Sequence, residues 1–389
     1  MPGFELFGDE ERQAINEIFD RNGGIIFAHG FDAMRNGVYK VREFERAFAA
    51  RMGVAHAQAV SSGTAAVRVA LQSLGVGPGD EVITQAFTFV ATVEAIRETG
   101  ATPIVVDVND TLNMDPEAFR AAITPRTKVV VPVHMMGECA EMDEIMAIAA
   151  EHGIAVMEDA AQALGATYFG RHAGTMGAAG AYSTDAGKTL NTGEGGLVVT
   201  NDEQRFVMAR AFHDHGHEYS TTLGRGEEGA LCFGFNFRMT ELQGAIGIAQ
   251  LEKLDTIIAR QRANKAKLMQ RLQAMPVQFR RSPDPTGDLS DTIVFFLPDR
   301  ERAATFVSRM RARGLGTKNL PDAIGWHFAK HWARVMKGHP LYDGRCETTW
   351  QKSADLLERS VAIPVMVKMD DARIEHVASN LVAIADEVL

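Results

Sequence analysis

The chain has 389 residues with 46% hydrophobic and 23% charged side chains, and its formal net charge is −10 at pH 7. The length favours two domains, and the composition is that of a folded globular enzyme rather than a disordered or fibrous protein. The acidic balance argues against a nucleic-acid partner, because binding phosphates requires a basic face.

The N-terminal residues and the cysteines bear on where the protein works. Residues 1–10 hold no basic stretch followed by an apolar one, and the chain has no run of about 18 uninterrupted apolar residues. Cys139, Cys232 and Cys346 are odd in number and far apart, which predicts neither a disulfide framework nor a zinc site. We expect a cytoplasmic protein with no membrane partner.

Short apolar segments alternate with longer helical patterns through much of the chain. Helices are predicted from Gly63 to about Leu74 and from Phe89 to Glu98, where apolar residues recur on one face. Strands are predicted at 57–60, 81–84, 102–107, 128–133 and 155–157. This alternation is typical of a mostly parallel sheet with helices on both faces, so the predicted fold class is α/β.

A longer helical pattern leads into the last third of the chain. It runs from Met239 to about Leu272, and a helix of that length usually bridges two domains. A strand at 292–297 and a helix from Glu301 to Gly314 follow, as in a small α+β domain. We therefore predict a large domain over residues 1–255 and a small C-terminal domain over residues 256–389.

Lys188 lies in a run of small residues, with the hydroxyl of Ser183 five positions earlier and a glycine-rich turn after it. This setting favours an amine that is presented to an aldehyde cofactor. Pyridoxal phosphate requires such an amine, an acid beside its pyridine nitrogen, donors for its phosphate and a ring against its pyridine. Lys188 can supply the amine and can carry a proton between substrate and cofactor.

Asp159 and Gln162 follow the predicted strand at 155–157. Open α/β sheets place their ligand groups at the carboxyl ends of strands. A buried carboxylate of Asp159 would there face the pyridine nitrogen and stabilise its positive charge. Gln162 would hydrogen-bond the ring hydroxyl from the same turn.

Donors for a phosphate lie in residues 61–64, Ser-Ser-Gly-Thr, where a predicted strand ends and a helix begins. Gly63 permits close approach of the backbone, and the first N–H groups of the helix, near Thr64, point outward. Ser183 adds a hydroxyl, and Phe89, which follows another strand, would stack on the pyridine. Each feature alone is commonly a helix cap or a solvated loop residue, but together and in this order they favour pyridoxal phosphate.

Several histidines could be ligands of a metal ion. His213, His215 and His217 alternate along the chain and could ligate zinc from an extended segment, but no cysteine or carboxylate cluster is near. We therefore expect no metal and an active-site loop instead. His327 and His331 lie four residues apart, and packing or a substrate contact explains them better than a metal.

A set of short motifs is spread over nearly the whole chain. They occupy residues 61–66, 79–83, 87–92, 123–128, 158–162, 193–196 and 236–239. The set resembles the sugar aminotransferases of the DegT/DnrJ/EryC/StrS family, which are fold-type-I pyridoxal phosphate enzymes. That resemblance implies a large domain with a mixed, mostly parallel sheet flanked by helices and a small α+β C-terminal domain. Family members with histidine at the position of Lys188 are dehydratases, so the lysine implies an aminotransferase.

The resemblance also implies a role for individual residues. Lys188 would bond to the cofactor aldehyde, Asp159 would pair with the pyridine nitrogen, Gln162 would contact the ring hydroxyl and Phe89 would stack on the ring. Gly63, Thr64 and Ser183 would hold the phosphate. Asn236 would reach the phosphate bound in the neighbouring subunit, so the active unit would be a homodimer with shared active sites.

A narrower resemblance concerns the substrate. Residues 1–8, 34–36, 214–217 and 235–238 resemble the subgroup that aminates C8 of oxidised 3-deoxy-octulosonate. It implies transfer of an amino group from glutamate to a keto or aldehyde carbon of a sugar, in surface-polysaccharide or natural-product biosynthesis. Candidate contacts for an acidic substrate are Arg35, Arg238, His215 and His217, because a guanidinium can grip a carboxylate with two hydrogen bonds.

Some positions depart from the family pattern and leave other functions open. Thr184 and Ala186 replace bulkier family residues beside the lysine, and the segment 318–336 differs. The acceptor could instead be a cyclitol or a nucleotide-linked keto-hexose, or the enzyme could be an eliminase. A pyridoxal-phosphate-binding regulator without catalysis is the alternative of another class, although Lys188, Asp159 and Gln162 argue against it.

Overall fold

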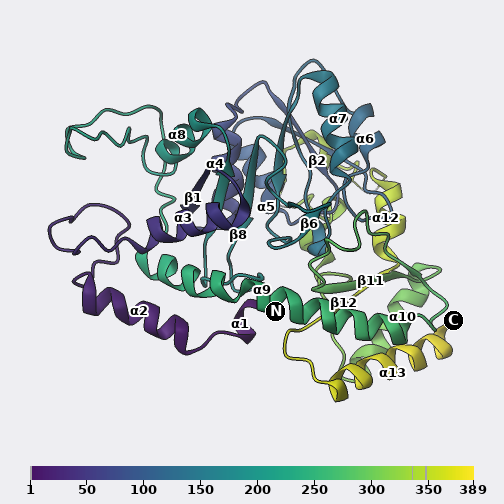
Figure 1. Ribbon diagram of the computed structural model, residues 1–389. Helices are drawn as coiled ribbons and strands as arrows, with labels where there is room; N and C mark the ends of the chain where they lie inside the picture. Colours follow the sequence, from purple (N-terminus) through teal and green to yellow (C-terminus); the bar gives the residue numbers. More distant parts are fainter. Residues whose placement is uncertain (1, 335, 347) are drawn as a thin grey trace.

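The computed structural model describes residues 2–334, 336–346 and 348–389. Two β-sheets organise this part of the chain, a seven-stranded sheet in the larger body and a three-stranded sheet towards the C-terminus (Figure 1). A further pair joins the short strands β6 (Thr167–Tyr168) and β7 (Arg171–His172).

The large sheet has the strand order β1-β9-β8-β5-β4-β2-β3. Its strands are β1 (His56–Val60), β2 (Glu81–Gln85), β3 (Thr102–Val106), β4 (Thr127–Val131), β5 (Ala155–Asp159), β8 (Ala179–Ser183) and β9 (Gly196–Thr200). The pairs among β3, β2, β4, β5 and β8 are parallel, whereas β9 is antiparallel to both β1 and β8. The predicted mixed, mostly parallel sheet is confirmed, and the predicted strands lie within a few residues of the observed ones.

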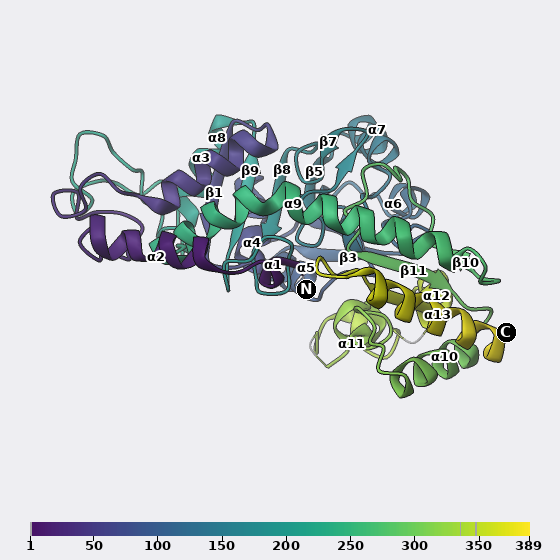
Figure 2. The ribbon, with the colours of Figure 1, turned by 60° about the horizontal axis from the view of Figure 1, so that its bottom comes forward.

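Helices cover both faces of this sheet (Figure 2). One face carries α4 (Gly63–Ser73), α5 (Ala91–Glu98) and α8 (Glu203–Phe212), and the other carries α3 (Lys40–Met52), α6 (Pro116–Ala121) and α7 (Met142–His152). Strand side chains alternate between the two resulting cores, as Val129 and Val131 join the first and Val130 the second. Burial on both faces explains why these strands are continuous apolar runs in the sequence.

The long predicted helix is confirmed as α9 (Glu241–Leu272). Thr240 caps it, because its hydroxyl accepts a hydrogen bond from Gln243 N while the Gln243 side chain accepts one from Thr240 N. The helix packs against α2 (Asp9–Arg21) and α3 in the larger body and against α13 (Asp371–Val388) near the C-terminus (Figure 2). It therefore links the two parts, and the proposed domain boundary at residues 255 and 256 lies within it.

The C-terminal part is built on an antiparallel sheet of β10 (Gln278–Phe279), β11 (Thr292–Phe296) and β12 (Ser360–Pro364). Helices α10 (Arg300–Ala312) and α13 pack on this sheet around a core that includes Phe295, Phe306 and Leu381. Short helical segments also occur at α1 (Pro2–Glu5), Met135–Gly137, Ala329–His331 and Pro340–Tyr342. Within the described ranges, no helix has both the length and the apolar character that a bilayer crossing requires.

The segment between α10 and α12 (Gln351–Glu358) returns to the large sheet. It contains α11 (Ile324–His327), and its aromatic side chains Phe328 and Trp332 are buried in the core beside α4 and α5. The backbone N–H of Thr88 donates to the carbonyl of His327, at 2.9 Å. This return brings α11 against the chain that follows β2, where Phe89 lies.

Candidate active site

Small and polar side chains converge at the edge of the large sheet where β1, β5 and β8 end. All three strands point the same way, because β9 is antiparallel to both β1 and β8. A cavity of about 300 Å³ lies at this edge. The predicted cofactor residues that line it are Gly63, Thr64, Phe89, Asp159, Gln162, Ser183 and Lys188.

Asp159 is a buried carboxylate at the last position of β5. Its Oδ2 accepts a hydrogen bond of 2.8 Å from the hydroxyl of Thr92, and its Oδ1 accepts one of 3.1 Å from Ala161 N. Burial raises the pKa of Asp159, and the two hydrogen bonds and the charge of Lys188 only partly offset that effect. A cationic N–H donor placed against this carboxylate would remove the cost of its burial.

The first turn of α4 forms a cradle for an anion. A Cβ atom at Gly63 would lie 2.6 Å from the Cβ of Ser183, so only glycine lets the helix approach β8 this closely. Ser62 caps the helix by accepting a hydrogen bond from Ala65 N at 3.0 Å. The N–H groups of Gly63 and Thr64 at the positive end of the helix dipole are thereby left to a ligand.

Lys188 is presented by a loop that folds back on itself between β8 and β9. Ala186 N donates to the carbonyl of Gly193 at 2.9 Å, and Lys188 N donates to the carbonyl of Asp185 at 3.0 Å. The amine Nζ lies 3.6 Å from Oδ2 of Asp185, and the Lys188 side chain is 21% exposed. The amine is therefore accessible from the cavity while a carboxylate holds it in place.

Similarity to known proteins defines which kind of enzyme has this cavity. The model of the DegT/DnrJ/EryC1/StrS aminotransferase family matches residues 30–382. The chain belongs to this family. It is therefore a pyridoxal-phosphate-dependent sugar aminotransferase, which confirms the predicted fold, cofactor and reaction class.

Individual members of the DegT/DnrJ/EryC1/StrS family extend the comparison. The chain is 35% identical over 381 residues to the spore coat polysaccharide biosynthesis protein SpsC of Bacillus subtilis, covering 96% of this chain and 93% of that one. It is 43% identical over 219 residues to GDP-perosamine synthase of Caulobacter vibrioides, covering 56% of this chain and 57% of that one. The crystal structure of an aminotransferase from Psychrobacter cryohalolentis superposes with a TM-score of 0.85 at 27% identity, covering 98% of both chains.

The cavity fits the cofactor of the DegT/DnrJ/EryC1/StrS family on observations of its own. The buried Asp159 carboxylate requires a cation, which a protonated pyridine nitrogen supplies. The cradle at Gly63 and Thr64 suits a phosphate, and Lys188 suits an aldehyde. These residues would hold the cofactor, and Ser183 lines the same cavity with its hydroxyl, which donates to Asp185 at 3.2 Å.

A second hollow of about 240 Å³ adjoins the cofactor cavity and shares Phe89, Gln162 and Lys188 with it. Its other wall comes from the returning C-terminal segment and includes His327, whose ring centroid lies 5.3 Å from that of Phe89. Burial lowers the pKa of His327, and the charge of Lys188 lowers it further. His327 Nδ1 faces the Ala323 carbonyl at 2.9 Å and donates to it, which leaves Nε2 as an acceptor.

Several residues of this aminotransferase site were absent from the sequence prediction. Asp291, Lys318 and Asn319 line the second hollow; Lys318 pairs with the buried Asp291, and Asn319 Nδ2 donates to Gln162 Oε1 at 3.3 Å. They lie more than 100 residues after Lys188, and no motif marks them. Thr92 had one signal, since it lies in the motif at residues 87–92.

The remaining predicted residues lie outside both hollows. Asn236 and His215 are exposed, and His217 Nδ1 pairs with Glu228 Oε1 at 2.6 Å. Arg238 Nη1 pairs with the buried Asp214, whose pKa is well below its usual range because Arg225, Tyr219 and Arg238 all donate to it. Within one chain, this segment is therefore separate from Lys188.

Arg35 is also remote from the cofactor cavity. Its side chain is fully buried, with Nη2 donating to the Phe27 carbonyl at 2.6 Å and lying 3.6 Å from Oε1 of Glu241. In this chain the guanidinium ties the N-terminal segment to the start of α9.

Proposed function

We propose that this aminotransferase moves the amino group of glutamate to a keto or aldehyde carbon of an acidic sugar, with the 8-oxo form of 3-deoxy-octulosonate as the acceptor. One observation carries the proposal. Lys188, Asp159 and the α4 cradle share a cavity that continues into a hollow lined by polar groups of the C-terminal segment. The cofactor cavity supports the amino-transfer chemistry, and the adjoining hollow gives room for a sugar beside Lys188.

The residues divide the chemistry between them. Pyridoxal phosphate, when bound, supplies an aldehyde carbon and a ring that accepts electrons. Lys188 holds that aldehyde and moves a proton to or from the substrate carbon, which its exposure to both hollows permits. Asp159 keeps the ring nitrogen protonated, the N–H groups of α4 bind the phosphate, and Phe89 covers the ring and excludes water.

An acidic, hydroxylated acceptor suits the second hollow. Lys318 and Asn319 keep further N–H donors beyond those that they give to Asp291 and Gln162, and the Nε2 acceptor of His327 suits a hydroxyl. The motifs at residues 1–8, 34–36, 214–217 and 235–238 are the further support for the octulosonate, and glutamate as donor rests on family resemblance.

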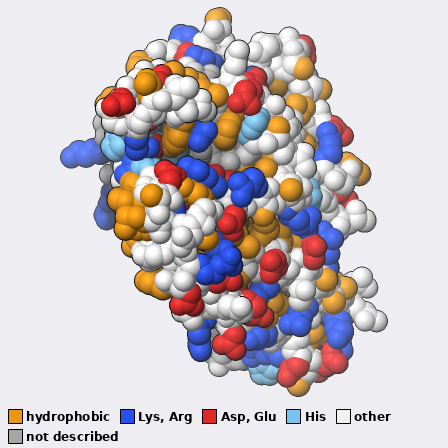
Figure 3. Space-filling view, turned by 60° about the vertical axis from the view of Figure 1, so that its left-hand side comes forward, with side chains coloured by type: hydrophobic (Ala, Val, Ile, Leu, Met, Phe, Trp, Pro, Cys, Tyr) orange, Lys and Arg blue, Asp and Glu red, His pale blue; other side chains and the backbone are white. Residues whose placement is uncertain are grey.

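We also propose that two copies of the chain form a homodimer with shared active sites. Large apolar side chains are exposed on two neighbouring segments, including Phe31 and Met34 on one and Leu231 and Phe233 on the other. Figure 3 views this side of the molecule and shows hydrophobic side chains beside basic ones. An apolar surface of this kind favours burial against a partner. Asn236 lies on the second segment and would reach the phosphate bound by the partner.

A nucleotide-linked keto-hexose is the second candidate acceptor. The relative of 43% identity is named GDP-perosamine synthase, although the match covers 56% of this chain. A purely regulatory role has less support, since Lys188, Asp159 and Gln162 are all in place around one cavity.

Product analysis with a panel of acceptors tests the proposal. The holoenzyme is loaded with glutamate, separated from it, and then given the 8-oxo octulosonate, a nucleotide-linked 4-keto-hexose or a keto-cyclitol, with aminated products detected by mass spectrometry. We expect the octulosonate to be aminated with the highest kcat/KM. Preferred amination of the nucleotide-linked sugar would replace the proposed acceptor, and failure of glutamate to load the enzyme would overturn the donor.

A further inference from the structure

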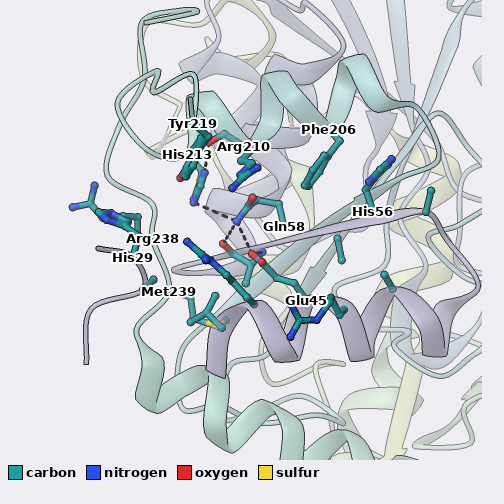
Figure 4. A pocket seen from close by; sticks show the side chains of 18 residues that line it. His29, Glu45, His56, Gln58, Phe206, Arg210, His213, Tyr219, Arg238 and Met239 are labelled. Atoms are coloured by element: carbon teal, nitrogen blue, oxygen red, sulfur yellow. Dashed lines mark hydrogen bonds between the residues drawn. The ribbon is translucent and has the colours of Figure 1, made fainter. Parts of the chain in front are cut away.

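A second cavity of about 280 Å³ lies at the free edge of the large sheet, between α3, β1 and α8 (Figure 4). β1 is the terminal strand of the sheet, so its outer edge is open to side chains of the two helices. None of the residues that line this cavity lines the hollows around Lys188. Within one chain, the cavity is therefore separate from the amino-transfer site.

Three arginines from two helices surround this edge cavity. Arg42 and Arg46 lie four residues apart on α3 and so share a face of that helix, and Arg210 approaches from α8. Among the described residues, none of these guanidinium groups has a carboxylate within 4.0 Å. Arg42 instead lies over the ring of Tyr39 and Arg210 over the ring of Tyr219, at 4.3 and 3.9 Å from the ring centroids. Unpaired guanidinium groups around one concavity are a suitable arrangement for an anion.

The floor of the edge cavity is polar and fixed. Glu45 Oε1 accepts hydrogen bonds from Gln58 Nε2 at 2.6 Å and from Ala59 N at 2.9 Å (Figure 4). Its other oxygen, Oε2, makes no hydrogen bond to a described residue and is left for a ligand. Burial raises the pKa of Glu45 to about 7, so near neutral pH the group can either donate to or accept from a hydroxyl.

A buried histidine without a hydrogen-bond partner also lines the edge cavity. His29 is 8% exposed; its Nε2 lies 3.5 Å from Oδ2 of the buried Asp214, and its Nδ1 makes no hydrogen bond to a described residue. Burial, helped by the charge of Arg225, lowers its pKa to about 4, so the ring is neutral and offers one donor and one acceptor. Leaving Nδ1 unsatisfied costs free energy that a hydroxylated ligand would recover.

One wall of the edge cavity is aromatic. His56 stacks on Phe206 with ring centroids 4.5 Å apart and an angle of 12° between the planes. Tyr219 lines the cavity from the other end of α8 (Figure 4). Flat aromatic faces pack well against the apolar C–H face of a sugar ring.

We propose that the edge cavity binds a small hydroxylated anion, either a sugar phosphate or a sugar acid, at a site distinct from the catalytic one. Arg42, Arg46 and Arg210 bind the anionic group. Glu45 and His29 hydrogen-bond hydroxyls, and Phe206 packs against the ring. A cavity of this size accommodates a single sugar.

Calorimetric titration of the pyridoxal-phosphate-loaded enzyme in a phosphate-free buffer tests the proposal. The ligands are glucose 6-phosphate, gluconate, inorganic phosphate and neutral glucose. We expect glucose 6-phosphate or gluconate to bind at one site per chain and more tightly than inorganic phosphate, and glucose not to bind. Binding of the sugar phosphate alone assigns a phosphate ligand, and binding of gluconate alone assigns a carboxylate ligand.

Variants locate the bound ligand. The double variant Arg46→Ala/Arg210→Ala should lose at least about tenfold in affinity, because two charge-assisted contacts disappear. Its glutamate half-reaction should be unchanged, which also shows that it is folded and loaded. Arg205→Ala is the matched control, since it removes the same charge from α8 outside the cavity and should bind normally. Absence of binding by the wild-type enzyme to both sugar anions, or equal binding by the double variant, would overturn the proposal.

Discussion

Thr92 donates a hydrogen bond of 2.8 Å from its hydroxyl to Oδ2 of Asp159, and both side chains are buried. Thr92 is the second residue of α5, and Asp159 is the last residue of β5. The helix that follows β2 therefore orients the carboxylate at the end of β5. Because Ala161 N occupies the other oxygen, the carboxylate has little freedom to turn. If Asp159 pairs with the cofactor ring as proposed, its charge is thus fixed in place before the cofactor binds.

Replacing the Asp159 carboxylate should greatly slow the reaction with glutamate. Asp159→Asn keeps the shape but removes the charge that pairs with the ring nitrogen, at a cost of about 3 to 5 kcal/mol. We expect the rate of the glutamate half-reaction to fall by about two to four orders of magnitude. Thr92→Val removes only one hydrogen bond to a charged group and should slow the reaction by about tenfold. An Asp159→Asn enzyme within twofold of wild type would contradict the assigned role.

A methyl group at Gly63 should weaken cofactor binding. The added Cβ would lie 2.6 Å from the Cβ of Ser183, so the first turn of α4 must move away from β8. Overpacking of this kind costs about 1 to 3 kcal/mol, and we expect the Kd for pyridoxal phosphate to rise by about tenfold or more. Gly77→Ala is the control, because a Cβ there meets no atom within 4 Å. Equal cofactor affinity in the two variants would argue against the cradle.

Mixing two impaired variants tests the shared active site. Lys188→Ala lacks the amine, and Asn236→Ala lacks the proposed phosphate contact to the partner. In a mixed dimer one of the two sites then has both residues intact, so about a quarter of all sites recover at random mixing. We expect activity and cofactor affinity to rise above the mean of the two variants after mixing and re-equilibration. Activity equal to that mean would contradict a contact of Asn236 with the phosphate bound by the partner.

The buried His213 should make stability depend on pH. Burial lowers its pKa to about 4, below its ordinary value of about 6.5, so the unfolded chain binds the proton first as the pH falls. This group therefore lowers the free energy of unfolding by about 2 kcal/mol between pH 7 and pH 5. Glu45 acts in the opposite direction, because its raised pKa of about 7 favours the folded state at low pH.

The two contributions separate in a variant comparison. His213→Gln should abolish the histidine contribution, so the variant should gain stability relative to wild type as the pH falls from 7 to 5. Denaturant unfolding at both pH values measures the difference, and the same stability difference at both values would contradict the account.

The cofactor side of the site was predictable because it is local to strand ends. Asp159, Ser183 and Gly63 each follow or end a buried strand, and parallel strands bring such residues to one edge of a sheet. The alternation of apolar runs likewise predicted five of the seven strands of the large sheet and their two-sided burial. Strands β8 and β9, on either side of the Lys188 loop, were not predicted, and nothing in the apolar run of β9 marks its antiparallel direction.

The substrate side was less predictable because distant segments build it. Lys318, Asn319 and His327 reach the cavity only because Phe328 and Trp332 pack back onto the large sheet. The burial of Arg35 likewise depends on Glu241, which is 206 positions away in the sequence. Neither contact leaves a periodic pattern in the sequence. Arg35 was therefore predicted as a substrate contact from its guanidinium group alone, whereas the fold buries it in the protein interior.

The absorption spectrum of the purified protein during a glutamate half-reaction tests the central claim most directly. We predict that the wild-type enzyme shows the visible band of a lysine-bound cofactor and that glutamate alone removes this band in a single turnover. Lys188→Ala should lack the band and fail to turn over, whereas Lys368→Ala should behave as wild type. A Lys188→Ala enzyme that retained full turnover with glutamate would contradict the assignment of this lysine.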